Sequence, residues 1–174
     1  MIAYKFLQPD GTSTFTGFRW ALPNGGPGPW VDARVDPCRS GIHACRAADL
    51  PLWIGRTLYE VELEGEVVEL RSKLVASRGR LLRRVEAWND PARDAYTRMC
   101  ADRAHALSSS VSPPLEGWVA VVDPSVAEGP ALLGFIAARI AEAISGPEGY
   151  LAERTLQTRW LVEQLGLETR PSRR

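Results

Sequence analysis

The chain of 174 residues is long enough for one ordinary domain with a substantial core. Hydrophobic residues make up 45% and charged residues 24%, which is typical of globular proteins and argues against a disordered or fibrous chain. The 21 basic and 21 acidic side chains cancel, so the charge expected of a dedicated nucleic-acid-binding protein is missing, and we expect no nucleic-acid partner.

The first half of the chain, residues 1–88, is predicted to form strands and turns. Ile2 to Leu7 is a first strand closed by the turn Pro9-Asp10-Gly11, and Thr14 to Trp20 is a second β-prone run. Leu22 to Pro29 is rich in proline and glycine and is predicted to be a loop.

Leu58 to Glu64 is the clearest strand, because apolar residues and glutamates alternate along it. Gly65 is expected to interrupt this strand, and Glu66 to Leu70 to continue into a partner strand. A basic stretch follows, between residues 71 and 84. The acidic and basic strands are therefore predicted to lie side by side with their outward charges paired, which contributes roughly 0.2–1 kcal/mol per pair.

The second half, residues 89–167, is predicted to be helical. Asn89 or Asp90 caps a first helix that has Pro91 at its start and runs to about Leu107. The apolar run from Trp118 to Val122 is a short strand or a segment buried under the helices.

Two more helices are expected after this run. Residues 131–144 carry almost no charge and are predicted to form the most buried helix, which Ser145-Gly146-Pro147 ends. The last helix runs from about Glu148 to Leu165, and Gly166 ends it. Its polar residues, Glu153, Gln157 and Gln164, share one face that is expected to be solvated.

The predicted fold is α+β, a mainly antiparallel N-terminal sheet packed against about three C-terminal helices. We expect a single domain over residues 1–167, with a sheet-rich half (1–88), a helical half (89–167) and a flexible tail (168–174). The odd cysteine count and the lack of a secretion signal favour the reducing cytoplasm. The longest apolar stretch is too short to span a bilayer, which takes about 20 residues, so no membrane partner is expected.

The segment from Cys38 to Cys45 is the candidate site, since it holds two of the three cysteines and one of the two histidines. In an extended backbone, His43 and Cys45 point to the same face, and they are the candidate catalytic residues. A reactive cysteine needs a nearby histidine or cation, and Arg39 and Arg46 flank the pair as candidate anion contacts. Buried, inert thiols are the competing interpretation.

A metal site is the other hypothesis that this pattern raises. Cys100 and His105 repeat the spacing of Cys38 and His43, which gives five potential zinc ligands. On a helix, however, five residues place two side chains about 140° apart around the axis and about 7.5 Å apart along it. We therefore predict no metal site, with Cys100 as a small buried residue and His105 at the surface.

The N-terminal half resembles a family of small bacterial and phage domains of unassigned function. The matching residues are Tyr4-Lys5, Gly17-Phe18, the motif from Cys38 to Cys45, and Val61-Glu62-Leu63-Glu64-Gly65. Ile42 stands where the family pattern has an aromatic residue, and the match covers roughly the first 75 residues. The abundance of Ala, Arg and Gly fits a bacterial source, and the helical half looks like an extension seen in actinobacterial relatives.

The order of elements also resembles the layout of ADP-ribosyltransferase-like domains, which implies NAD binding around Tyr4, Gly41 and His43. The residues themselves identify no cofactor. One hypothesis is a small-molecule-binding, nucleotide-binding or transferase-like protein whose site gathers Tyr4, Arg39, Gly41 and Arg46 around His43 and Cys45. The alternative is a non-enzymatic interaction module in which the Cys/His motif only stabilises the fold.

Overall fold

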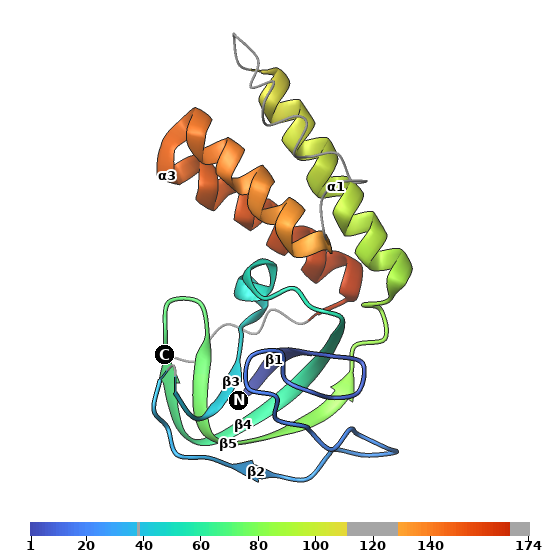
Figure 1. Ribbon diagram of the computed structural model, residues 1–174, viewed down its shortest axis with the longest axis vertical. Coiled ribbons are helices and arrows are strands. Elements are labelled where there is room, and N and C mark those ends of the chain that lie inside the picture. Colours follow the sequence, from blue (N-terminus) through green and yellow to red (C-terminus); the bar gives the residue numbers. More distant parts are fainter. Residues whose placement is uncertain (38, 111–128, 168–174) are drawn as a thin grey trace. The chain divides into compact units, whose positions relative to one another are not determined.

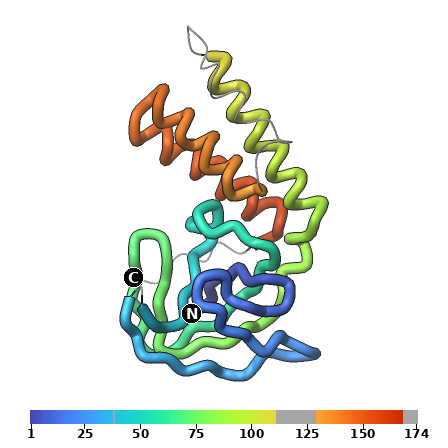
Figure 2. Tube along the Cα trace, in the orientation of Figure 1, coloured from blue at the N-terminus to red at the C-terminus, as the bar shows by residue number. Residues whose placement is uncertain are grey.

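The computed structural model describes residues 1–37, 39–110 and 129–167. The chain divides into two compact units, Met1–Trp88 and Asn89–Arg174, which Figures 1 and 2 show in sequence colours. The first unit is built on a sheet and the second on helices, so the predicted α+β class is confirmed. The run Trp118 to Val122 and the predicted tail lie outside the described residues. None of the described helices is long and apolar enough to cross a membrane.

The first unit consists of five strands and one short 3-10 helix in its described part. These are β1 (Ile2–Leu7), β2 (Val31–Asp32), β3 (Ile42–Ala44), η1 (Ala47–Leu52), β4 (Thr57–Glu69) and β5 (Leu74–Arg84). The strands pair antiparallel in the order β1-β4-β5-β2, and β3 also pairs with β5. Figure 1 shows β4 and β5 as a long, curved hairpin.

One further pair of hydrogen bonds closes this sheet into a small barrel. The amide of Tyr4 donates to the carbonyl of Cys45, and the amide of Cys45 donates to the carbonyl of Tyr4, both at 2.8 Å. Because Cys45 directly follows β3, these bonds join β3 to β1. The strands β1, β4, β5 and β3 therefore form a closed ring, in which the paired strands no longer present free edges.

The barrel core follows from the alternation of side chains along the strands. Its buried residues are Ala3, Leu7, Trp20, Ile42, Ala44, Tyr59, Val61, Leu63, Leu74, Ala76 and Leu81. They come from β1, β3, β4 and β5 together with Trp20 of the first long loop. The two residues of β3 in this set, Ile42 and Ala44, place the side chain of His43 on the opposite face of the strand.

The charged faces of β4 and β5 confirm the predicted cross-strand pairing. An Nη2 atom of Arg80 lies 2.7 Å from an oxygen of Glu62, and Nε of Arg83 donates to Glu60 at 2.8 Å. The expectation for Gly65 was wrong, because β4 continues past it through a bulge with a register shift between Glu64 and Val67. A bulge accommodates one extra residue without ending the pairing.

The region around Thr14 to Trp20 also differs from its prediction. Its backbone forms a tight loop that is closed by a bridge between Thr12 and Arg19 and by the amide of Ser13 donating to Phe18. Local β propensity did not produce a strand here, because strands require a partner with which to form a ladder.

The second unit contains α1 (Asp90–Ser109) and α3 (Gly129–Leu165). The side chain of Asn89 accepts a hydrogen bond from the amide of Ala92, which confirms the predicted cap. Within α3, Gly146 has a φ of 70°, a conformation that favours glycine, and Pro147 follows it. The predicted stop is thus confirmed as a break at which the chain doubles back, so that α3 comprises two helical segments (Figure 1).

The polar residues of the second α3 segment correct a prediction. Glu153 and Gln157 are buried, not solvated, while Gln164 is exposed. Arg103 donates to Glu153 at 2.8 and 3.1 Å. Gln157 donates from Nε2 to the carbonyl of Gly134 at 2.9 Å, and its Oε1 accepts from Arg154 at 2.9 Å. These partners allow polar groups inside the helical unit, since a buried polar group is tolerated once it is hydrogen-bonded.

Candidate functional site

The Cys/His motif forms the strand that closes the barrel. The turn before it is held by Ser40, whose hydroxyl donates to the carbonyl of Arg34 at 2.5 Å. Residues 42–44 form β3 and pair with residues 74–76 of β5. Cys38 lies outside the described residues, so the site consists of the motif from Arg39 onward.

Gly41 serves the packing of this strand. Its φ is 119°, a value that side-chain-bearing residues rarely adopt, and a Cβ atom there would lie 2.5 Å from Cγ1 of Val75. The position therefore requires glycine so that the backbone can approach β5. This close contact leaves no room for a ligand between Gly41 and Val75, where the resemblance to ADP-ribosyltransferase-like domains implies NAD binding.

Cys45 is buried, with 3% of its surface exposed. Burial and, to a lesser extent, the neighbouring carboxylate of Asp49 raise the pKa of the Cys45 thiol well above its usual range. A thiol that stays protonated at neutral pH is a poor nucleophile. The environment of Cys45 therefore favours a packing role.

The other predicted ligand contacts are spread over several environments. Arg46 donates from Nε to Asp49 at 2.6 Å and from Nη2 to the carbonyls of Leu70 and Arg71 at 2.9 and 3.0 Å. Its guanidinium thus holds the β4–β5 turn. Arg39 is exposed in the turn before β3, and Tyr4 is 4% exposed. The structure places Tyr4 beside Cys45 through their backbone pair and leaves Arg39 in solvent.

His43 differs from its neighbours in the motif. It is half-buried, and its Nε2 atom is buried without a hydrogen-bond partner among the described residues. Burial lowers the pKa of the His43 imidazole, and the positive charges of Lys73 and Lys5 lower it further. The ring is therefore neutral near pH 7, next to two cationic side chains.

Lys5 is a site residue that the sequence reasoning missed. It lies on β1 between Ala3 and Leu7, on the face that lines the barrel core, opposite Tyr59. Its Nζ donates to the carbonyl of His43 at 2.7 Å and lies 5.4 Å from the ring centroid of Trp20. Burial lowers the Lys5 pKa to about 8. The period-two pattern of Ile2 to Leu7 contained the signal, because it places a lysine on an apolar face.

The remaining cysteine and histidine are as predicted. Cys100 is fully buried in α1, where burial raises its pKa to about 12, and His105 is exposed. Across residues 1–37, 39–110 and 129–167, no three His, Cys, Asp or Glu side chains are grouped closely enough to hold a metal ion.

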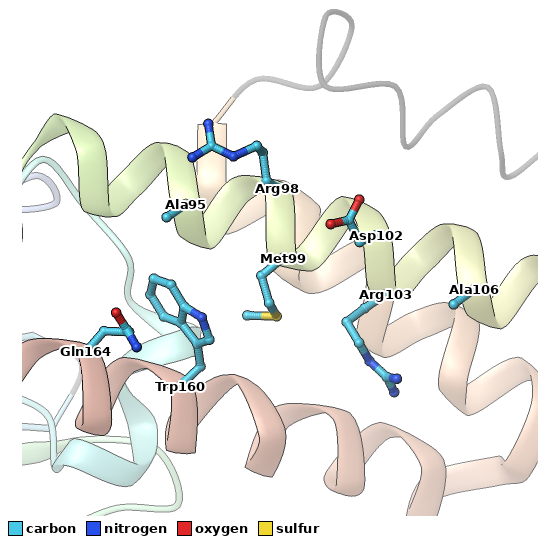
Figure 3. A pocket seen from close by; sticks show the side chains of 8 residues that line it. All are labelled: Ala95, Arg98, Met99, Asp102, Arg103, Ala106, Trp160 and Gln164. Atoms are coloured by element: carbon cyan, nitrogen blue, oxygen red, sulfur yellow. The ribbon is translucent and has the colours of Figure 1, made fainter.

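An open groove of about 670 Å³ in the helical unit is a second candidate. It lies between α1 and the second segment of α3, and Figure 3 shows Met99 and Trp160 facing each other across it. Arg98 and Asp102 lie on its rim and point away from α3 (Figure 3), and Arg103 binds the buried Glu153. The charged groups of the groove are thus engaged or directed outward, and none of the predicted site residues lines it.

Comparisons with known proteins give no relative for this chain: no family model, no curated protein and no solved structure matches it. The resemblance at the Cys/His motif and the ADP-ribosyltransferase-like layout therefore stay predictions. The geometry around His43 is the basis for a functional proposal.

Proposed function

We propose that the barrel unit binds a small molecule carrying an anionic group, and that His43, Lys5 and Lys73 form the binding site. The observation that carries this proposal is the Nε2 atom of His43, buried and unpaired within the described residues, beside two lysines. The proposal retains the predicted small-molecule site at His43 and replaces the predicted arginine contacts with lysines.

An unpaired buried nitrogen is unfavourable for the fold. Leaving such an atom without a partner costs about 1–3 kcal/mol, and most buried polar atoms in proteins do have partners. The exceptions often have a function that the fold does not explain. In the barrel, the neighbouring Lys5 and Lys73 determine which ligand charge is favourable.

The two lysines select for negative charge. A cationic ligand would be repelled by both ammonium groups, whereas a carboxylate or phosphate would be attracted. A bound anion would also favour the imidazolium form of His43, which can donate a hydrogen bond from each ring nitrogen. Anion binding is therefore expected to raise the His43 pKa and so to reverse the effect of the lysines.

This expected rise can be measured by NMR, because the chain has only two histidines, His43 and His105. We would follow the ring signals of both through a pH titration with and without inorganic phosphate, and then with AMP and NAD. We expect the His43 pKa to rise by about one unit at saturating anion while His105 changes little. Equal responses of the two rings, or no response of His43 at tens of millimolar anion, would contradict the proposal.

A variant pair separates binding from folding. His43→Ala should abolish the response to ligand with little change in melting temperature, and His105→Ala should keep both. Ligands that bind the native state raise the melting temperature, so the same samples can be screened against NAD by thermal shift. A large loss of melting temperature in His43→Ala with no ligand found would favour the alternative.

That alternative is a non-enzymatic interaction module with a structural Cys/His motif. The observation in its favour is that three other motif residues serve the barrel: Gly41 packs on β5, Cys45 pairs with Tyr4, and Arg46 holds the β4–β5 turn. His43 is the residue of this strand to which the barrel assigns no such contact among the described residues.

A further inference from the structure

Lys5 lies where a lysine is unexpected. Its neighbours on the same face of β1, Ala3 and Leu7, are 0% and 1% exposed and belong to the barrel core. Lysine is rarely buried unless a carboxylate pairs with it. No ion pair connects Lys5 to a carboxylate within the described part of the chain.

The surroundings of the amine favour its neutral form. Its partners are a backbone carbonyl, that of His43, and the indole of Trp20, and neither carries a negative charge. An ammonium group that loses its hydration without gaining a counter-ion releases its proton more readily. The lowered pKa of Lys5, about 8, agrees with this. A neutral amine can still donate one N–H to the carbonyl of His43 while its lone pair stays available.

We propose that Lys5 is a nucleophile that captures aldehydes bearing an anionic group. The Nζ lone pair attacks the carbonyl carbon, a C–N bond forms, and a proton moves from nitrogen to oxygen to give a carbinolamine. Loss of that hydroxyl as water then leaves an imine between Lys5 and the former aldehyde carbon. No oxidant or reductant takes part. Desolvated lysines are the residues that proteins use for this chemistry.

The anionic group in this proposal rests on the proposed function of the site. Lys73 and a protonated His43 would hold that group, and Lys5 would react with the carbonyl carbon beside it. Part of the surface of Lys5 stays exposed, which gives small molecules access to the residue. The reaction therefore needs a compact aldehyde.

The chain suits a direct test, because Lys5 and Lys73 are its only lysines. The full-length protein would be incubated at pH 7 with sodium cyanoborohydride and either glyoxylate or propanal, and labelling of each amine followed by mass spectrometry. At this pH about a tenth of amines with a pKa of 8 are neutral, against roughly four in ten thousand for an ordinary lysine. We expect Lys5 to be labelled at least tenfold faster than Lys73, and glyoxylate to label Lys5 faster than propanal does.

Variants and outcomes complete the design. Lys5→Arg should lose the fast label and Lys73→Arg should keep it, with circular dichroism confirming that both are folded. Similar labelling rates for Lys5 and Lys73 would overturn the proposal, even if phosphate still shifts His43 and the anion site stands. Fast labelling of Lys5 by both aldehydes without preference for glyoxylate would support the nucleophile and contradict the anion site. The α-amine of Met1 is distinguished from Lys5 by peptide fragmentation.

Discussion

The two units of this protein treat buried polar groups in opposite ways. In the helical unit, Gln157 is fully buried and its amide is hydrogen-bonded at both ends. In the barrel, the Nε2 atom of His43 is buried without a partner among the described residues, and Lys5 is placed on the core face without a counter-ion there. The first arrangement stabilises a fold, whereas the second leaves binding capacity unused.

This contrast shows why polarity inside a protein is weak evidence for function unless the partners are counted. Glu153 and Gln157 are the more deeply buried pair, yet Arg103, Arg154 and the carbonyl of Gly134 satisfy them. A satisfied polar network rigidifies a core. His43 and Lys5 are less buried and less satisfied, so they remain free to respond to a ligand. Substitutions in each unit can test this difference.

The largest effect is expected for Gln157→Leu in the helical unit. Leucine fills a similar volume but leaves the carbonyl of Gly134 without its donor and removes the acceptor of Arg154 and of the Tyr96 hydroxyl. Each buried group left unpaired costs about 1–3 kcal/mol, so we expect a loss of about 3–4 kcal/mol in the free energy of unfolding. Chemical denaturation measures it.

The matched control is Gln164→Leu, two turns further along the same helix. Gln164 is exposed, and its replacement should change the free energy of unfolding by less than about 0.5 kcal/mol. If the two variants were equally stable, the network around Gln157 would contribute nothing and the comparison between the units would fail.

A smaller loss is expected for Gly41→Ala in the barrel. The added Cβ would meet Val75 at 2.5 Å, and alanine is strained at a φ of 119°. We expect a loss of about 2–3 kcal/mol. Gly26→Ala is the control, because a Cβ at that position has no neighbour within 4 Å and the φ is not in the left-handed region. Equal stabilities of the two variants would show that β3 does not need its close approach to β5.

The elements that the sequence predicted well are those with local signals. β1 begins and ends at the predicted residues, because apolar alternation and the turn at Pro9-Asp10-Gly11 act over a few positions. The cap at Asn89 and the break at Gly146 are likewise local. The bulge at Gly65 was mistaken for a strand end, because a glycine in a strand pattern fits both and only the partner strand distinguishes them.

The candidate site was predictable only in part, because it depends on contacts between distant residues. The motif pointed to His43, but the burial of Cys45 and the bonds of Arg46 arise from pairing with β1 and with the β4–β5 turn. The burial of Gln157 depends in the same way on Gly134, 23 residues earlier in the chain. A sequence shows which groups are polar, and the fold determines which of them are satisfied.

The smallest and most specific effect concerns the pH dependence of Lys5. Its pKa is about 8 in the folded protein and near 10.5 in the unfolded chain. Between these values the unfolded chain holds a proton that the folded protein has released, so the Lys5 amine makes folding more favourable as the pH rises. Below about pH 8 both states are protonated and this contribution is constant. We therefore expect the parent protein to gain stability relative to Lys5→Met as the pH rises from 8 to 10.5. Denaturation of both proteins at several pH values measures the difference, and Lys73→Met is the control for charge. A difference between the parent and Lys5→Met that stayed constant across this range would show that Lys5 is solvated like an ordinary lysine, which would remove the contrast between the barrel and the helical unit.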